Sequence, residues 1–275
     1  MPQAAGLYYS LLAGGHPDHP PVILIHGAGS HHLCWPVEIR RLKGYRVLAL
    51  DLPGHGRSEE AGQQTISAYS QKVLDFMEAV GIYQAVLVGH AMGGAIALMM
   101  AKMHPERVLG IGVISSGAYL KVPKELLEDL ASPFTLPLAL KLLQDRLFGA
   151  DVTTAVSKLV MQTLKETRPG VLYGDWQACE RFDLRSEVEK IATPAWVAMG
   201  MQDRLVSPAC ALFLASQMPK AQLQWIPPAG HMVILEKPQE LCQRLRKFLL
   251  ELYPNESNLW RSRIESGIKP NRIIF

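Results

Sequence analysis

Short runs of apolar residues recur along the chain, and several end in clusters of Gly and His. The six clearest runs cover residues 21–25, 45–50, 85–88, 108–115, 194–199 and 221–226. They are too short for helices and have no polar face, which is typical of parallel strands buried on both sides. Amphipathic stretches such as 67–80 and 92–103 lie between them. This alternation predicts an α/β fold with a doubly wound, mostly parallel sheet.

The alternation stops between residues 119 and 189. Helical patterns broken by prolines fill this segment, at 124–130, 136–148 and 153–166, and no convincing strand is visible. They are either connecting helices or an inserted domain. Because the strand pattern resumes at 194, we expect an inserted helical cap over the sheet. The core is then 1–118 and 190–253. Residues 254–275 form a C-terminal tail that is flexible or docks on the body or on a neighbouring chain, as in a possible homodimer.

Composition narrows the class of protein. The 275 residues suit one large domain or a domain with an insertion. Apolar residues make up 48% and charged residues 19%, which excludes intrinsic disorder. The net charge of +3, without a basic stripe, argues against nucleic acid as a partner. Four widely spaced cysteines indicate reduced thiols, and no signal peptide or membrane span is expected. We therefore expect a cytoplasmic enzyme.

Residues 89–93, Gly-His-Ala-Met-Gly, have the pattern of a nucleophile elbow, Gly-x-Ser-x-Gly, with Ala91 in place of the serine. In such an elbow a sharp turn between a strand and a helix exposes the central side chain above the sheet. Glycines on either side are required because the helix and the neighbouring strands approach closely. The apolar run before this motif and the amphipathic stretch after it supply the strand and the helix.

Four further loops follow predicted strands. They are His-Gly-Ala-Gly at 26–29, Asp-Leu-Pro-Gly-His-Gly-Arg-Ser at 51–58, Gly-Met-Gln-Asp at 200–203 and Gly-His at 230–231. With the elbow, these motifs resemble the α/β-hydrolase family over residues 20–250. The resemblance implies that family's fold and a catalytic triad in the order nucleophile, acid, histidine. The corresponding positions are Ala91, Asp203 and His231.

The resemblance also implies a role for each residue. His231 accepts the proton of a serine nucleophile and returns it to the leaving group, while Asp203 fixes the imidazole tautomer. The backbone N–H groups of Ala28 and Met92 form the oxyanion hole. We expect supporting roles for three neighbouring residues: His26 braces the oxyanion loop, Gly27 belongs to that loop, and His90 makes a local hydrogen bond.

Other polar residues were weighed for the same site. Asp175 and Asp183 are weaker candidates for the triad acid, and His55 is expected to be structural. Ser115 and Ser116 end a strand and are interpreted as turn residues. A pair of adjacent histidines, His31 and His32, suggests a metal, but no third ligand falls at a suitable spacing. We therefore expect neither a metal nor another cofactor.

Ala91 has no nucleophilic atom, so the chain as given cannot form an acyl-enzyme at this position. Either a working enzyme carries an inactivating Ser-to-Ala substitution, or the protein is naturally non-catalytic. Because the acid, the histidine and the oxyanion loop are all still present in the sequence, we favour the substitution. Aspartate and cysteine nucleophiles occur in related enzymes, but the surrounding residues favour serine.

The predicted reaction is hydrolysis of a carboxylic ester, as in a carboxylesterase or a monoacylglycerol lipase. The cap is rich in apolar side chains, which favours a small-molecule substrate with an apolar acyl or aryl group. They include Phe134, Phe148, Met161, Tyr173 and Trp176, and arginines 146, 181 and 185 are candidates for the pocket mouth. Lactone hydrolysis, carbon–carbon bond hydrolysis and a non-catalytic binding protein are the alternatives.

Overall fold

The computed structural model describes residues 2–12, 14–16 and 19–252. Eight strands form one sheet in the order β1-β2-β4-β3-β5-β6-β7-β8. Strands β1 and β2 are antiparallel to their neighbours, and the six strands from β4 to β8 are parallel to one another. The predicted doubly wound, mostly parallel α/β fold is confirmed. The strands are β1 Gln3–Ala4, β2 Leu7–Leu12, β3 Val22–Ile25, β4 Val47–Leu50, β5 Ala85–His90, β6 Val108–Ile114, β7 Ala195–Gly200 and β8 Ala221–Ile226.

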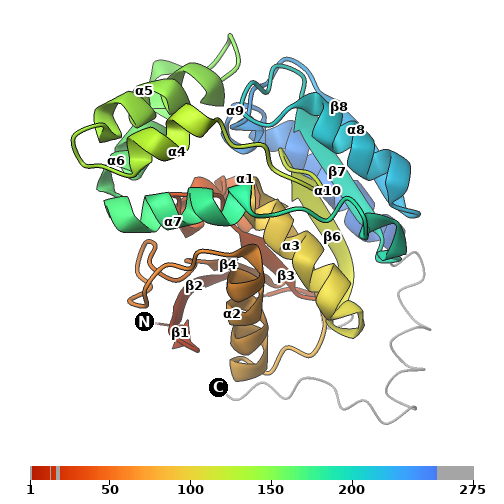
Figure 1. Cartoon of the computed structure of the whole chain (residues 1–275). Helices are drawn as coiled ribbons and strands as arrows, with labels where there is room; N and C mark the ends of the chain where they lie inside the picture. Colours follow the sequence, from red (N-terminus) through yellow and green to blue (C-terminus); the bar gives the residue numbers. More distant parts are fainter. Residues whose placement is uncertain (1, 13, 17–18, 253–275) are drawn as a thin grey trace, which may run out of the picture.

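The central strands owe their apolar sequences to burial on both faces. Every residue of β3, β4, β5 and β7 is buried. Helices α2 (Ile66–Ala79) and α3 (Met92–Met103) pack together in front of the sheet, and α8 (Pro208–Gln217) lies on the same side (Figure 1). Behind the sheet, α10 (Pro238–Leu252) packs against the short helix α1 (Val37–Arg40).

The amphipathic pattern of α10 explains its place. Its buried residues, Leu241, Leu245, Phe248 and Leu249, follow the spacing of one helix face. Phe248 stacks on Trp196 of β7 with ring centroids 6.5 Å apart. No helix among the described residues is long and apolar enough to cross a membrane.

A helical insert separates β6 from β7, as the sequence predicts. Its helices are α4 (Lys124–Leu130), α5 (Leu136–Leu147), α6 (Thr154–Glu166) and α7 (Pro169–Glu180). They lie together above the carboxyl ends of the strands (Figure 1). An isolated antiparallel bridge joins Tyr119 to Asp183, so the two ends of the insert lie side by side. The exact domain limits at 119 and 189 stay a prediction, and the predicted tail at 254–275 lies outside the described residues.

One short α-helix and three 3-10 turns complete the described residues. The α-helix is α9 (Val233–Glu236), which follows the loop after β8, and the 3-10 turns are η1 (His32–Cys34), η2 (Pro105–Arg107) and η3 (Val188–Lys190). Cys34, Cys179, Cys210 and Cys242 are all free thiols, in agreement with the absence of a disulfide framework.

Candidate active site

The turn between β5 and α3 is sharp and strained. Ala91 sits at its tip with φ +50° and ψ −115°, a left-handed conformation that a residue with a side chain rarely adopts. Gly89 and Gly93 make the turn possible. A Cβ on Gly89 would lie 2.0 Å from the Gly93 carbonyl oxygen, and one on Gly93 would lie 2.1 Å from that of Ile25. The backbone thus has the elbow geometry that the glycine pattern indicates.

His231 and Asp203 form a buried pair on the loops after β8 and β7. The imidazole Nδ1 of His231 donates to Asp203 Oδ2 at 2.9 Å, and both side chains are almost fully buried. The other carboxylate oxygen accepts the backbone N–H groups of Leu205 and Val206, each at 2.9 Å. Because Nδ1 carries the proton, Nε2 of the neutral imidazole is left as a base. His231 lines the same cavity as Ala91.

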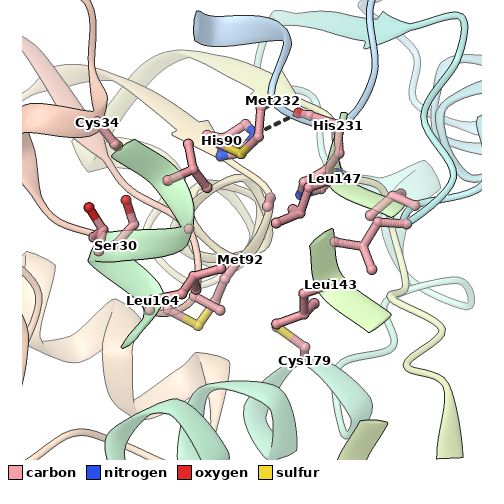
Figure 2. Close-up of a pocket in the computed structure, with 18 of the residues that line it drawn as sticks. Ser30, Cys34, His90, Met92, Leu143, Leu147, Leu164, Cys179, His231 and Met232 are labelled. Carbon is pink, nitrogen blue, oxygen red and sulfur yellow. Dashed lines mark hydrogen bonds between the residues drawn. The ribbon is translucent and has the colours of Figure 1, made fainter. Parts of the chain in front are cut away.

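His90 is hydrogen-bonded to the backbone of His231. Its Nε2 donates to the carbonyl oxygen of His231 at 2.9 Å, the dashed line in Figure 2. Complete burial, together with the nearby His231 ring, lowers the pKa of His90 to about 3. Glu236 fastens the neighbouring backbone, because its carboxylate accepts the N–H groups of Gly230 and Gly149. Burial raises the pKa of Glu236.

The loop after β3 faces the elbow. His26 Nδ1 donates to the Gly27 carbonyl oxygen at 2.8 Å, and its Nε2 accepts the Leu52 N–H at 2.9 Å. Burial, with the nearby His55, lowers the pKa of His26 to about 3, so the ring stays neutral. A Cβ on Gly27 would lie 3.2 Å from that of Ala91. The loop and the elbow are therefore in close contact.

Two backbone donors at this contact have no partner. The N–H groups of Ala28 and of Met92, the first residue of α3, donate to no acceptor among the described residues. Both residues line the cavity that also contains Ala91 and His231. A free N–H at the start of a helix attracts negative charge. The two groups can therefore bind an oxyanion beside Ala91.

This cavity has a volume of about 390 Å³ and lies between the elbow and the insert. Figure 2 shows Met92 and His231 among the residues that line it, together with Leu143, Leu147 and Leu164 of the insert. Among the described residues, no Asp or Glu lines the cavity, and its charged side chains are Arg40 and Lys121. An apolar ligand with a neutral or anionic end fits this lining.

Part of the cavity lining differs from the sequence prediction. Of the large apolar residues expected in the cap, Trp176 lines the cavity, whereas Phe134 is 94% exposed. The arginines expected at the mouth, 146, 181 and 185, do not line it. Arg185 pairs with Asp183, and Arg181 donates to the Gln64 carbonyl oxygen, so their charges are used elsewhere. Arg40 and Lys121 were missed because neither belongs to a motif.

The remaining acid candidates lie away from His231. Asp183 is exposed and binds Arg185. Asp175 is fully buried in α7, where its carboxylate accepts hydrogen bonds from His55 and from the backbone N–H of Gly29. Ser115 and Ser116 are buried and do not line the cavity.

The histidine pair has the third neighbour that spacing did not reveal. Folding brings Asp51 to His31 and His32, with potential ligand atoms within 4.8 Å of one another. However, Asp51 already accepts the backbone N–H and the ring Nδ1 of His32 and the backbone N–H of Arg57. The carboxylate serves as a structural acceptor, and the expectation that no metal binds stays a prediction.

Comparisons with known proteins identify the family of the chain. The chain is 31% identical over 254 residues to the "Dihydrolipoyllysine-residue acetyltransferase component of acetoin cleaving system" of Pseudomonas putida, covering 83% of this chain. It spans only 63% of that relative's length. It is 29% identical to the "Pimeloyl-[acyl-carrier protein] methyl ester esterase" of Yersinia enterocolitica, covering 88% of this chain and 96% of the relative.

A solved structure, the enol-lactonase from Burkholderia xenovorans LB400, superposes with a TM-score of 0.82 at 25% identity, covering 88% of this chain and 96% of that one. A family model described as "alpha/beta hydrolase fold" matches residues 20–238, which is most of the chain. This protein therefore belongs to the α/β-hydrolase fold family.

Proposed function

We propose that the chain carries the site of a carboxylic ester hydrolase, of the carboxylesterase or monoacylglycerol-lipase type, with residue 91 at the position of a serine nucleophile. The observation that carries the proposal is the convergence on one cavity of three features: the strained Ala91 turn, the His231–Asp203 pair and the two free N–H groups of Ala28 and Met92. Together these are the parts that acyl transfer to water requires.

With serine at position 91, the mechanism follows from the geometry. Nε2 of His231 takes the hydroxyl proton as the oxygen attacks the ester carbonyl, and Asp203 offsets the charge of the imidazolium that forms. The N–H groups of Ala28 and Met92 stabilise the tetrahedral oxyanion, and each such donor contributes about 10²–10³ in rate. His231 then protonates the leaving alcohol, and water releases the acid in a second, equivalent cycle.

With alanine at position 91, the same cavity binds an ester but forms no covalent bond to it. In a comparable triad, loss of the nucleophile reduced turnover by roughly 10⁶. We propose that the chain as given is inactive in this way and that the Ala91→Ser variant is active. Two similar proteins, named as a methyl ester esterase and an enol-lactonase, support ester chemistry, since a lactone is a cyclic ester.

The substrate that we propose is a small ester with an apolar acyl or aryl group. The leucines of α5 and α6 that surround the cavity favour such a group over a polar one.

The test is hydrolysis of p-nitrophenyl butyrate by the folded Ala91→Ser variant. We expect turnover that the parent lacks and that a further His231→Ala substitution removes. Asp183→Asn in the Ala91→Ser background is the matched control, because this exposed carboxylate lies outside the cavity. A folded Ala91→Ser variant that hydrolyses no short or medium-chain ester would refute the proposal.

Ala91 itself favours a second candidate, a non-catalytic protein that holds an apolar ligand under the insert. The same variant separates the two. An Ala91→Ser protein that binds an ester by calorimetry without hydrolysing it supports the binding protein, whereas turnover supports the hydrolase.

A further inference from the structure

The helical insert holds the oxyanion loop directly. Gly29, the last residue of that loop, donates its N–H to Asp175 Oδ2 of α7 at 2.8 Å. Its carbonyl oxygen lies 3.0 Å from the hydroxyl of Thr167, at the end of α6, which shares its proton with the Thr163 carbonyl. Both polar groups of one peptide residue are thus bound by side chains from a different part of the fold.

The Gly29 backbone is packed closely against side chains of the insert. Its φ is +61°, and a Cβ there would lie 2.6 Å from a methyl group of Leu172 and 2.8 Å from one of Leu164. Both leucines belong to the insert. The loop is therefore packed against α6 and α7 as well as hydrogen-bonded to them.

Asp175 ties this contact to the rest of the core. Its carboxylate is fully buried and accepts two further hydrogen bonds, from His55 Nε2 at 2.8 Å and from the hydroxyl of Tyr69 at 2.5 Å. The other ring nitrogen of His55 lies 3.0 Å from the Pro53 carbonyl oxygen. Because both nitrogens face acceptors, the ring is protonated and its charge balances that of Asp175.

The two ends of the loop are fixed from opposite sides. His26, in the core, binds the Gly27 carbonyl oxygen, and the insert binds Gly29. Ala28 lines the cavity and lies between these two anchors, and its N–H has no partner among the described residues. Rotation of the peptide that carries the Ala28 N–H therefore requires breaking one of them.

We propose that Asp175 and Thr167 are positioning residues, through which the insert sets the orientation of the Ala28 N–H for transition-state binding. This inference rests on the proposed function and adds to it: the insert completes the oxyanion hole in addition to enclosing the substrate. Since an oxyanion forms only in the transition state, loss of the anchor lowers kcat and leaves KM unchanged.

The first measurement needs no catalysis. Hydrogen exchange at the Gly29 amide, whose N–H donates to Asp175, is measured in the parent chain and in Thr167→Val and Asp175→Asn. We expect faster exchange at this amide in both variants. Thr135→Val is the matched control, because this hydroxyl is also shared between two carbonyl oxygens, those of Asp129 and Ser132, within the insert. It is expected to leave the loop amides unchanged.

The second measurement repeats the three substitutions in the Ala91→Ser background. A lost neutral hydrogen bond corresponds to about three- to tenfold in rate, so we expect that decrease in kcat for Thr167→Val. For Asp175→Asn we expect up to about 10²-fold, the contribution of one oxyanion donor. Thr167→Val decides the question if Asp175→Asn does not fold.

Unchanged exchange at the Gly29 amide, or faster exchange with the kcat of the Thr135→Val control, would overturn the inference. Absence of hydrolysis in the Ala91→Ser protein itself would refute the proposed function. The exchange data would then still decide whether the insert anchors the loop.

Discussion

Two buried neutral histidines make the fold sensitive to acid. Nε2 of His26 accepts a hydrogen bond and must therefore be unprotonated, whereas Nε2 of His90 donates one. Burial lowers the pKa of each histidine to about 3. In the unfolded chain a histidine has a pKa of about 6.5. The lowered folded value means that the unfolded state binds more protons below pH 6.5. The stability from these two residues is therefore present above that pH and is lost as the pH falls toward 3.

The magnitude follows from the two pKa values. Between pH 7 and pH 4, each histidine removes about 3 kcal/mol from the free energy of unfolding, or about 6 kcal/mol together. A domain of ordinary stability has about 5–15 kcal/mol in total. We therefore expect the protein to lose a large part of its stability over this range, before most carboxylates are protonated.

The assay is urea unfolding at intervals from pH 7 to pH 4, with the variant His90→Gln. Glutamine keeps an N–H donor for the His231 carbonyl but removes one titrating group, so the loss of stability between pH 7 and pH 4 should be smaller by about 3 kcal/mol. Ser70→Ala is the control: it removes a buried hydrogen bond to Ser67 without removing an ionisable group, and should lower stability equally at every pH. Equal pH dependence in the parent and His90→Gln would refute the reasoning.

Three further predictions follow from the site. In the Ala91→Ser background, Asp203→Asn should lower kcat by about 10⁴ with little change in KM, because the amide favours the wrong tautomer of His231; esterase kinetics with equal kcat in both proteins would contradict the pairing. Burial alone lowers the pKa of His55, but the charge and hydrogen bond of Asp175 raise it overall, so stability from this ion pair is present below pH 6.5 and declines as the pH rises. Urea unfolding of His55→Gln should lack that decline above about pH 6.5, and a parent whose stability is flat above that pH would argue against the ion pair. Finally, Arg40 and Lys121 should make Ala91→Ser prefer esters with an anionic end over matched cationic ones by about two- to fivefold; Arg40→Gln should reduce this ratio in competition assays, and a preference for the cationic ester would exclude the predicted role.

The parallel sheet was predictable because its strands carry their own signal. Each central strand is buried on both faces, so the apolar runs at 21–25 and 85–88 could come from no exposed element. Strand β2, which lies next to the edge strand β1, was missed, since its burial fades from Leu7 to the exposed Leu12. A strand that is only partly covered does not carry the signal of one buried on both faces.

Two helices were missed for a different reason. Helices α7 and α8 both begin with a proline, Pro169 and Pro208, and Pro169 was interpreted as a break. Proline is tolerated in the first turn of a helix, where its missing N–H is not needed. Gly170 and Gly174 weaken the helical pattern of α7 further. Because Asp175 lies on that helix, its contact with Gly29 could not be predicted either.

The candidate site divides in the same way. Gly89, Gly93 and His231 could be located because a sharp turn or a reactive side chain leaves a motif of fixed spacing. The links made by Asp175 and Thr167 to Gly29 join residues 138 and more positions apart and have no local pattern. Only the folded chain brings them together.

The most direct test of the account is covalent labelling of the Ala91→Ser variant with a fluorophosphonate, followed by mass spectrometry of the peptide that contains residue 91. We expect a phosphonyl adduct on that serine, with labelling strongly slowed by His231→Ala. A folded variant that carries no adduct at residue 91 would contradict the claim that this turn, the His231–Asp203 pair and the N–H groups of Ala28 and Met92 form one hydrolase site.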